Sequence, residues 1–150
     1  MDWFSKAFIK ASLTWFGIGV TLGAVMASWP NAAAYRTAHF HMNLLGFVSM
    51  MIFGVAYHVL PRFVGHPLHN RRLAAVHWWV ANAGLVVLTT GFVLLPTIGA
   101  RAYPVQGAGG AISALGAYLF IYNMWRTLDG PKVLQRVRQA PGPLPVVDKD

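Results

Sequence analysis

Six histidines are the side chains in this sequence best suited to bind a metal ion or a haem iron, because imidazole is a common metal ligand. They are His39, His41, His58, His66, His69 and His77. The chain has no cysteine, which excludes disulfides, thiolate nucleophiles, iron–sulfur clusters and thioether-attached haem. Its four carboxylates lie near a terminus or after the last apolar run, which excludes paired-carboxylate hydrolysis and a buried acidic proton relay. We therefore identify candidate cofactor ligands but no catalytic residue.

The histidines fall into two layers along the apolar runs that contain them. His39 and His41 form an outer layer at the start of an apolar run over residues 38–60. The inner layer begins with His58, near the end of the same run, and includes the three histidines that follow it. His41 and His58 are about 25 Å apart along a helix that rises about 1.5 Å per residue. One metal ion or haem cannot bind both layers, so each layer needs its own explanation.

In the outer layer, His39 and His41 point to nearly opposite faces of a helix, because successive residues turn by about 100°. A regular helix cannot bind one metal ion with both. Three interpretations remain: one of them binds a haem iron, they contribute to a copper or zinc site, or both are interfacial histidines bonded to water and carbonyls. Met26 lies at a depth comparable to His41, so it is either a second haem ligand or a packing residue.

In the inner layer, His58 and His77 come from adjacent antiparallel helices whose ends meet at one loop. His66 or His69 could complete a tetrahedral or square site for copper or zinc. The alternative for His66 and His69 is that they are solvated loop histidines beside Pro67. His77 lies within an apolar run, where an imidazole needs a partner, and this favours a ligand role for it.

The elements that position these histidines are predicted to be membrane-spanning helices. Hydrophobic residues make up 56% of the 150 residues and charged residues only 11%, against about 25% in soluble proteins. Apolar runs of about 20 residues, enough to cross a bilayer, occur four times, at residues 7–29, 38–60, 73–98 and 105–125. The prediction is an all-α, four-helix transmembrane bundle over residues 1–128, with the first run retained as a helix rather than cleaved as a signal peptide.

Glycine is frequent in the apolar runs, and small residues let helices approach closely in lipid or make room for a flat cofactor. The glycines concerned are Gly17, Gly19, Gly23, Gly46, Gly54, Gly84, Gly91, Gly107, Gly110 and Gly116. Residues 129–150 are predicted to form a cytoplasmic tail that is basic at first, then rich in proline, and disordered.

Lysine and arginine predict the orientation of the bundle. Ten of the twelve fall near the termini or in the loop between the second and third runs, and only Arg36 and Arg101 fall on the opposite side. This positive-inside bias predicts that both termini are cytoplasmic, in a bacterial cytoplasmic membrane. The net charge of +8 is therefore assigned to anionic lipid, and no nucleic-acid partner is expected.

Segments 36–45 (Arg-Thr-Ala-His-Phe-His-Met-Asn-Leu-Leu) and 53–62 (Phe-Gly-Val-Ala-Tyr-His-Val-Leu-Pro-Arg) resemble the second core helix of the catalytic subunit of haem–copper oxidases, especially the nitric oxide reductase and cbb3-type branch. Segments 72–96 and 118–127 are similar to later helices of that subunit. The resemblance implies that a histidine at the outer start of this helix is an axial ligand of low-spin haem b. Matching Arg-x-x-His selects His39, whereas matching His-x-Asn selects His41, and we favour His41 because it is deeper.

The resemblance also implies an assembly. The family's subunit is arranged as three quasi-equivalent four-helix arcs, so a chain similar to one arc could act as a homotrimer or as a subunit of a respiratory complex. The histidines of one chain do not supply the family's complete haem–copper binuclear site, so enzymatic activity is left open. Arg36 could pair with a haem propionate.

The leading hypothesis is therefore a haem b-binding membrane protein that transfers electrons or handles a diatomic gas such as NO or O2. The alternative is a histidine-rich copper- or zinc-binding protein, or a structural subunit of a larger membrane complex without catalysis of its own.

Overall fold

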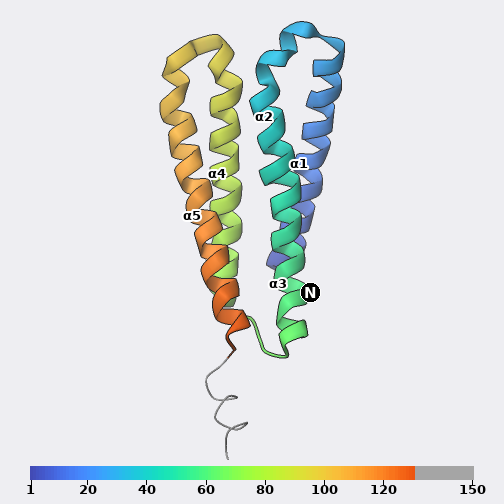
Figure 1. Cartoon of the computed structure of the whole chain (residues 1–150), viewed down its shortest axis with the longest axis vertical. Coiled ribbons are helices and arrows are strands. Elements are labelled where there is room, and N and C mark those ends of the chain that lie inside the picture. Colours follow the sequence, from blue (N-terminus) through green and yellow to red (C-terminus); the bar gives the residue numbers. More distant parts are fainter. Residues whose placement is uncertain (131–150) are drawn as a thin grey trace, which may run out of the picture.

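The computed structural model describes residues 1–130, which contain helices and turns and no strand. All but the first two residues of the predicted tail lie outside these described residues. The helices are α1 (Trp3–Ser28), η1 (Pro30–Tyr35), α2 (Arg36–His41), η2 (Met42–Ser49), α3 (Met50–Val64), α4 (Arg71–Ile98), η3 (Gly99–Ala102) and α5 (Tyr103–Leu128). In Figure 1 they form two tall hairpins that stand side by side, with α1 against the α2–α3 rod and α4 against α5. The all-helical prediction is confirmed.

Three helical stretches are long and apolar enough to cross a membrane: Trp3–Ser28, Pro30–Val64 and Arg71–Leu128. The last of these folds back on itself at η3 (Figure 1). One end of the molecule, which we call the turn end, carries η1 and η3. The other, the loop end, carries the first residues of α1, the segment 65–70 and the end of α5. Four membrane crossings and the side on which each end lies stay predictions.

Proline ends fewer helices than the sequence suggests. Pro30 and Pro104 lie at helix starts, where a missing N–H costs nothing, as expected. Pro61 lies inside α3, which continues to Val64 before Gly65 ends it in a left-handed conformation, with a φ of 73°. Pro96 likewise lies within the last turn of α4. Both prolines are so near a helix end that each disturbs only a final turn.

The rod that carries the outer histidines changes its winding directly after them. Residues Met42–Ser49 form a π-helix, in which backbone bonds close over five residues. The Ser49 hydroxyl donates to the carbonyl of Leu44, five residues earlier, at 2.9 Å. Because of this segment, the regular turn of about 100° per residue does not extend from His41 to α3. Short π-helical segments occur frequently at functional sites.

The second hairpin is held by close contact between the backbones of α4 and α5. A β-carbon added at Gly109 would lie 2.2 Å from the backbone nitrogen of Leu88, and one at Gly84 would lie 2.6 Å from the nitrogen of Ser113. Gly107 has no atom within 4 Å of the same point. The sequence indicated Gly107 and Gly110 as packing glycines, but the closest approach falls between them, at Gly109.

We expect Gly109→Ala to lower the free energy of unfolding by about 1–3 kcal/mol, because the added methyl group must push the backbones of α4 and α5 apart. Thermal unfolding in mild detergent measures the change. Gly107→Ala makes the same chemical change two residues away in open space and should leave the unfolding temperature unchanged. Equal behaviour of the two variants would contradict the packing described here.

Candidate functional site: two histidine layers

The His39 side chain packs against α1, where Gly23 makes room for it. Its Nδ1 is 2.9 Å from the carbonyl oxygen of Gly19. A β-carbon at Gly23 would lie only 2.9 Å from Cε1 of the imidazole. The Asn43 amide, one turn further along the rod, donates to the His39 carbonyl at 2.9 Å and lies 3.4 Å from Nδ1. The ring is therefore fixed by the neighbouring helix α1, and the Asn43 side chain is fixed on the backbone of His39.

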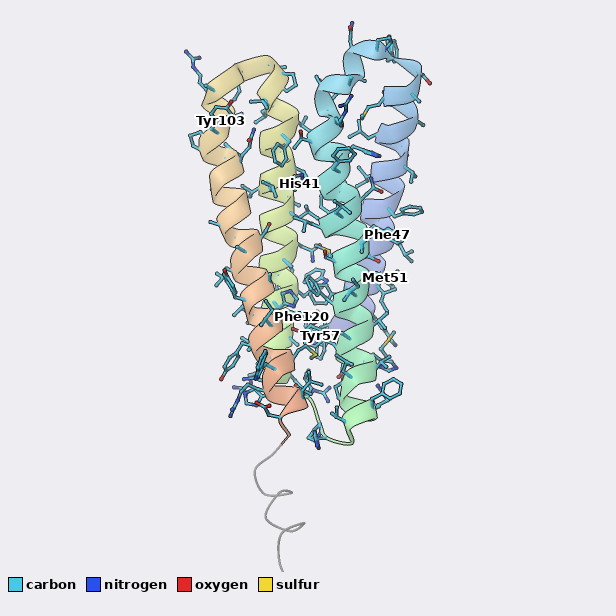
Figure 2. All side chains as sticks on the ribbon, in the orientation of Figure 1. His41, Phe47, Met51, Tyr57, Tyr103 and Phe120 are labelled. Carbon is cyan, nitrogen blue, oxygen red and sulfur yellow. The ribbon has the colours of Figure 1, made fainter. Side chains whose placement is uncertain are left out.

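His41 points to a different neighbour. Its Nδ1 is 2.8 Å from the carbonyl of Thr37, in the same helix, and its ring lies over Phe92 of α4 with ring centroids 4.6 Å apart. Figure 2 shows His41 on the side of the rod that faces α4. His39 contacts α1 and His41 contacts α4, so the two side chains do not meet at one metal ion.

The two outer histidines share a donor pattern that suits an iron ligand. In each, Nδ1 lies beside a backbone carbonyl, which can only accept, so this nitrogen carries the proton and Nε2 keeps its lone pair. A histidine that ligates a metal usually donates its other N–H to a carbonyl or carboxylate in this way. The donor chemistry therefore fits a haem iron at either residue.

The two other residues proposed for the outer site are Met26, on α1, and Arg36, on α2. Met26, half-buried in α1, follows Gly23 by three residues and so lies on the same side of the helix one turn further on. Arg36 is exposed at the first position of α2. Neither makes a side-chain hydrogen bond within residues 1–130, so both side chains are free to interact with a ligand.

His77 is fully buried among aromatic rings at the centre of the loop-end half. Its ring centroid is 4.7 Å from those of Phe8 and Phe53, and 5.7 Å from that of Phe120. These rings come from α1, α3 and α5, and His77 itself belongs to α4, so four helices meet at this site. His77 Nδ1 is 3.0 Å from the hydroxyl of Tyr57 on α3. Figure 2 shows Tyr57 and Phe120 directed into the space between the two hairpins.

The second nitrogen of His77, Nε2, has no hydrogen-bond partner among the residues that the structure describes. A buried polar atom without a partner costs about 1–3 kcal/mol. The hydrogen bond to Tyr57 is thus the one polar interaction that compensates for burying this imidazole.

The other inner histidines do not gather around His77. His58 receives a hydrogen bond from Arg62, with Nη1 of Arg62 2.8 Å from its Nδ1. His66 Nδ1 is 3.3 Å from the carbonyl of Thr127, and the backbone N–H of His69 donates to the Thr127 hydroxyl at 3.0 Å. Within residues 1–130, no three histidine or carboxylate side chains lie close enough to hold one metal ion. The copper or zinc site predicted at His58, His77 and the loop histidines gains no support from this arrangement.

Sequence reasoning missed two partners of these histidines. Tyr57 stands in the segment that carries the resemblance and was not expected to pair with His77, yet it is the hydrogen-bond partner of His77. Asn43 was noted only as part of a motif, yet its side-chain amide donates to the backbone carbonyl of His39. The sequence does contain a signal for the second contact. Gly19 and Gly23 are four residues apart on α1, and they face Asn43 and His39, which are four residues apart on the rod.

We expect Tyr57→Phe to lower the free energy of unfolding by about 1–2 kcal/mol, because it leaves both nitrogens of the buried imidazole unpaired. Adding His77→Leu to this variant should recover part of the loss, since an apolar side chain has no polar atom to satisfy. Thermal unfolding of the two variants in detergent measures both effects. A Tyr57→Phe protein as stable as the original would rule out a structural role for the hydrogen bond.

No protein-family model matches the sequence. The chain is similar to the cbb3-type cytochrome c oxidase subunit CcoN1 of Stutzerimonas stutzeri, at 28% identity over 83% of this chain and 33% of the relative. It is similar to cytochrome c oxidase subunit 1 of Rhodobacter capsulatus at 26% identity, over 78% of this chain and 28% of the relative. A bacteroid subunit 1 homologue of Bradyrhizobium diazoefficiens is 25% identical over 92% of this chain and 29% of the relative.

The chain spans about a third of the length of these curated relatives. The likeness covers most of the residues described here, and it agrees with the resemblance carried by the histidine-containing segment. Long apolar helices and oxidase relatives together identify an integral membrane protein. The chain is, in sequence, similar to subunit 1 of the haem–copper oxidases.

Proposed function

We propose that this chain is a haem b-binding membrane protein that acts in electron transfer or in binding a diatomic gas such as NO or O2. The observation that carries the proposal is the contact between His39 Nδ1 and the carbonyl of Gly19, at 2.9 Å. This contact holds an imidazole in the tautomer and orientation that an axial ligand needs. The names of the relatives add support, since each is a cytochrome c oxidase subunit or its homologue.

His39 has a stronger geometric basis for the axial role than His41, which the sequence analysis favoured. The carbonyl beside His41 Nδ1 belongs to its own helix, so that contact does not depend on how the helices pack. The carbonyl beside His39 Nδ1 belongs to α1, so the packing of α2 against α1 sets the direction of this ring. A ligand held by a second helix keeps its direction when a cofactor binds.

Four other residues would complete this site. Gly23 leaves room for the imidazole and Gly19 for the side chain of Asn43. Met26 would be a second ligand, and Arg36 would pair with a propionate through its planar guanidinium. When bound, haem supplies a one-electron redox centre and an iron that binds diatomic gases. A second axial ligand supplied by another chain is the alternative to Met26.

The assembly is also part of the proposal. By analogy with the three quasi-equivalent four-helix arcs of the family's subunit, the chain acts with others, either as a homotrimer or within a respiratory complex. The six histidines of one chain do not provide a complete haem–copper centre, so we propose no reaction for the single chain. A copper- or zinc-binding role is the second candidate from the sequence, and the scattered inner histidines do not favour it.

We expect the purified protein, supplied with haem during expression, to show a Soret band that is abolished in His39→Ala and retained in His41→Ala. An optical spectrum with and without dithionite measures the band and reports whether the iron has two axial ligands. His69→Ala, an exposed loop histidine, is the matched control. Absence of a Soret band in the unaltered protein would refute haem binding, and its loss only in His41→Ala would transfer the axial role to that residue.

A pair of glycine variants separates a specific effect on His39 from general damage. Gly23→Ala brings a methyl group within 2.9 Å of Cε1 and should shift the reduced spectrum or lower haem occupancy. Gly17→Ala, with no atom within 4 Å of its new methyl group, should do neither. Equal spectra for these two variants would count against His39 as the ligand.

We further propose that the protein lies in a bacterial cytoplasmic membrane with both termini and the segment 65–70 on the cytoplasmic side. The distribution of basic residues within residues 1–130 supports this, because Arg62, Arg71 and Arg72 lie at the loop end, whereas only Arg36 and Arg101 of that part of the chain lie near the turn end.

Because the chain has no cysteine, single cysteines report the orientation directly. A membrane-impermeant maleimide applied to spheroplasts should label Ala100→Cys, in η3, and should label Pro67→Cys only after the membrane is permeabilised. The reverse pattern would invert the orientation, and labelling of both before permeabilisation would refute the four-crossing topology.

A further inference from the structure

A polar pocket lies at the loop end, well separated from the outer histidines, and the proposed haem site does not use it. It has a volume of about 280 Å³. Its lining combines the residue before α1, the last turns of α3, the segment 65–70 and the first residue of α4. Its polar members are Asp2, Tyr57, His58, Arg62, His66 and Arg71. Two guanidinium groups and two imidazoles therefore face one carboxylate.

The charges in this pocket are not balanced. The Asp2 carboxylate pairs with Arg71, so one of the two arginines is already neutralised. Arg62 contacts only the ring and the carbonyl of His58, both neutral acceptors, among residues 1–130. Both contacts are made by Nη1, so Nη2 and Nε keep their N–H donors for a ligand. An anion that accepts from a guanidinium would complete the site.

An apolar groove begins beside this pocket and runs along α3. It has a volume of about 350 Å³ and is lined by Met51, Ile52, Val55, Ala56, Val59 and Leu60. Val55 and Val59 lie three residues before His58 and Arg62, so they are neighbours on the helix surface. From Met51 to Leu60 the groove extends about 13 Å along the helix axis. Figure 2 shows Met51 on the α3 side of the molecule, away from α4 and α5.

We propose that the pocket and groove together bind one anionic phospholipid, with its phosphate at Arg62 and an acyl chain along α3. The phosphate diester supplies the missing anion, and the groove continues from the polar pocket into the apolar span. Basic pockets at the membrane surface bind anionic headgroups by the same chemistry. A free phosphate offers that chemistry too, but it would leave the groove unused.

The test is a titration of the purified protein in mild detergent, read out as the unfolding temperature. Phosphatidylglycerol should raise this temperature, whereas phosphatidylcholine and inorganic phosphate at the same concentration should not. Arg62→Gln should weaken the apparent affinity for phosphatidylglycerol about tenfold, a loss of about 1.4 kcal/mol, because it removes the charged guanidinium that donates to the phosphate. Arg126→Gln, an exposed arginine of α5 outside the pocket, makes the same charge change and should leave the affinity unaltered.

Three outcomes would overturn the proposal. They are an equal response to phosphatidylglycerol and phosphatidylcholine, an equal response to inorganic phosphate, and equal affinities for the Arg62→Gln and Arg126→Gln variants. If Arg62→Gln does not purify, Arg62→Lys keeps the charge but loses the planar fork, and it should still bind more weakly than the original. Unfolding temperatures do not depend on haem absorbance, so a failure here is distinct from a failure of the proposed haem site.

Discussion

The hydrogen bond between Tyr57 and His77 joins α3 to α4 across the boundary between the hairpins, where α1 packs against α4 and α3 packs against α5. Around it, buried side chains from α1, α3, α4 and α5 form one apolar core. In a lipid environment apolar side chains gain little by leaving lipid for protein, so polar contacts and close packing must supply the specificity. An imidazole that finds its partner only across this boundary makes one arrangement of the hairpins preferable to others.

Hydrogen bonds at the loop end also hold the helices in one arrangement, here near the predicted membrane surface. The Asn123 side chain accepts from the backbone N–H of Asn70 at 3.0 Å and donates to its carbonyl at 2.9 Å. This pair of bonds fastens the start of α4 to the end of α5. At the turn end the outer histidines use backbone carbonyls instead, and the position of the His39 ring depends on how closely α2 approaches α1. Side-chain hydrogen bonds therefore hold the helices together at the loop end, whereas glycines determine how closely the helices pack at the turn end.

Much of this architecture could be predicted from the sequence. Apolar runs predicted the helical stretches, and the turn of about 100° per residue predicted that His39 and His41 face different neighbours, as their contacts with Gly19 and Phe92 show. The partner of His77 could not be predicted, because Tyr57 precedes it by 20 residues and only the packing of the hairpins brings the two together. Nor could Gly109 be distinguished from Gly107, since both read as small residues and only the rotation of α5 separates them.

The π-helical segment Met42–Ser49 has a consequence for comparing this chain with longer relatives. A backbone loop that closes over five residues holds one residue more than the regular loop over four. Such a turn can accommodate an inserted residue without rotating either end of the rod. His39 can keep its place against α1, and Tyr57 its place beside His77, while the number of residues between them varies. Equivalent residues on the two sides of this segment are therefore better identified by the contacts they make than by the number of residues between motifs.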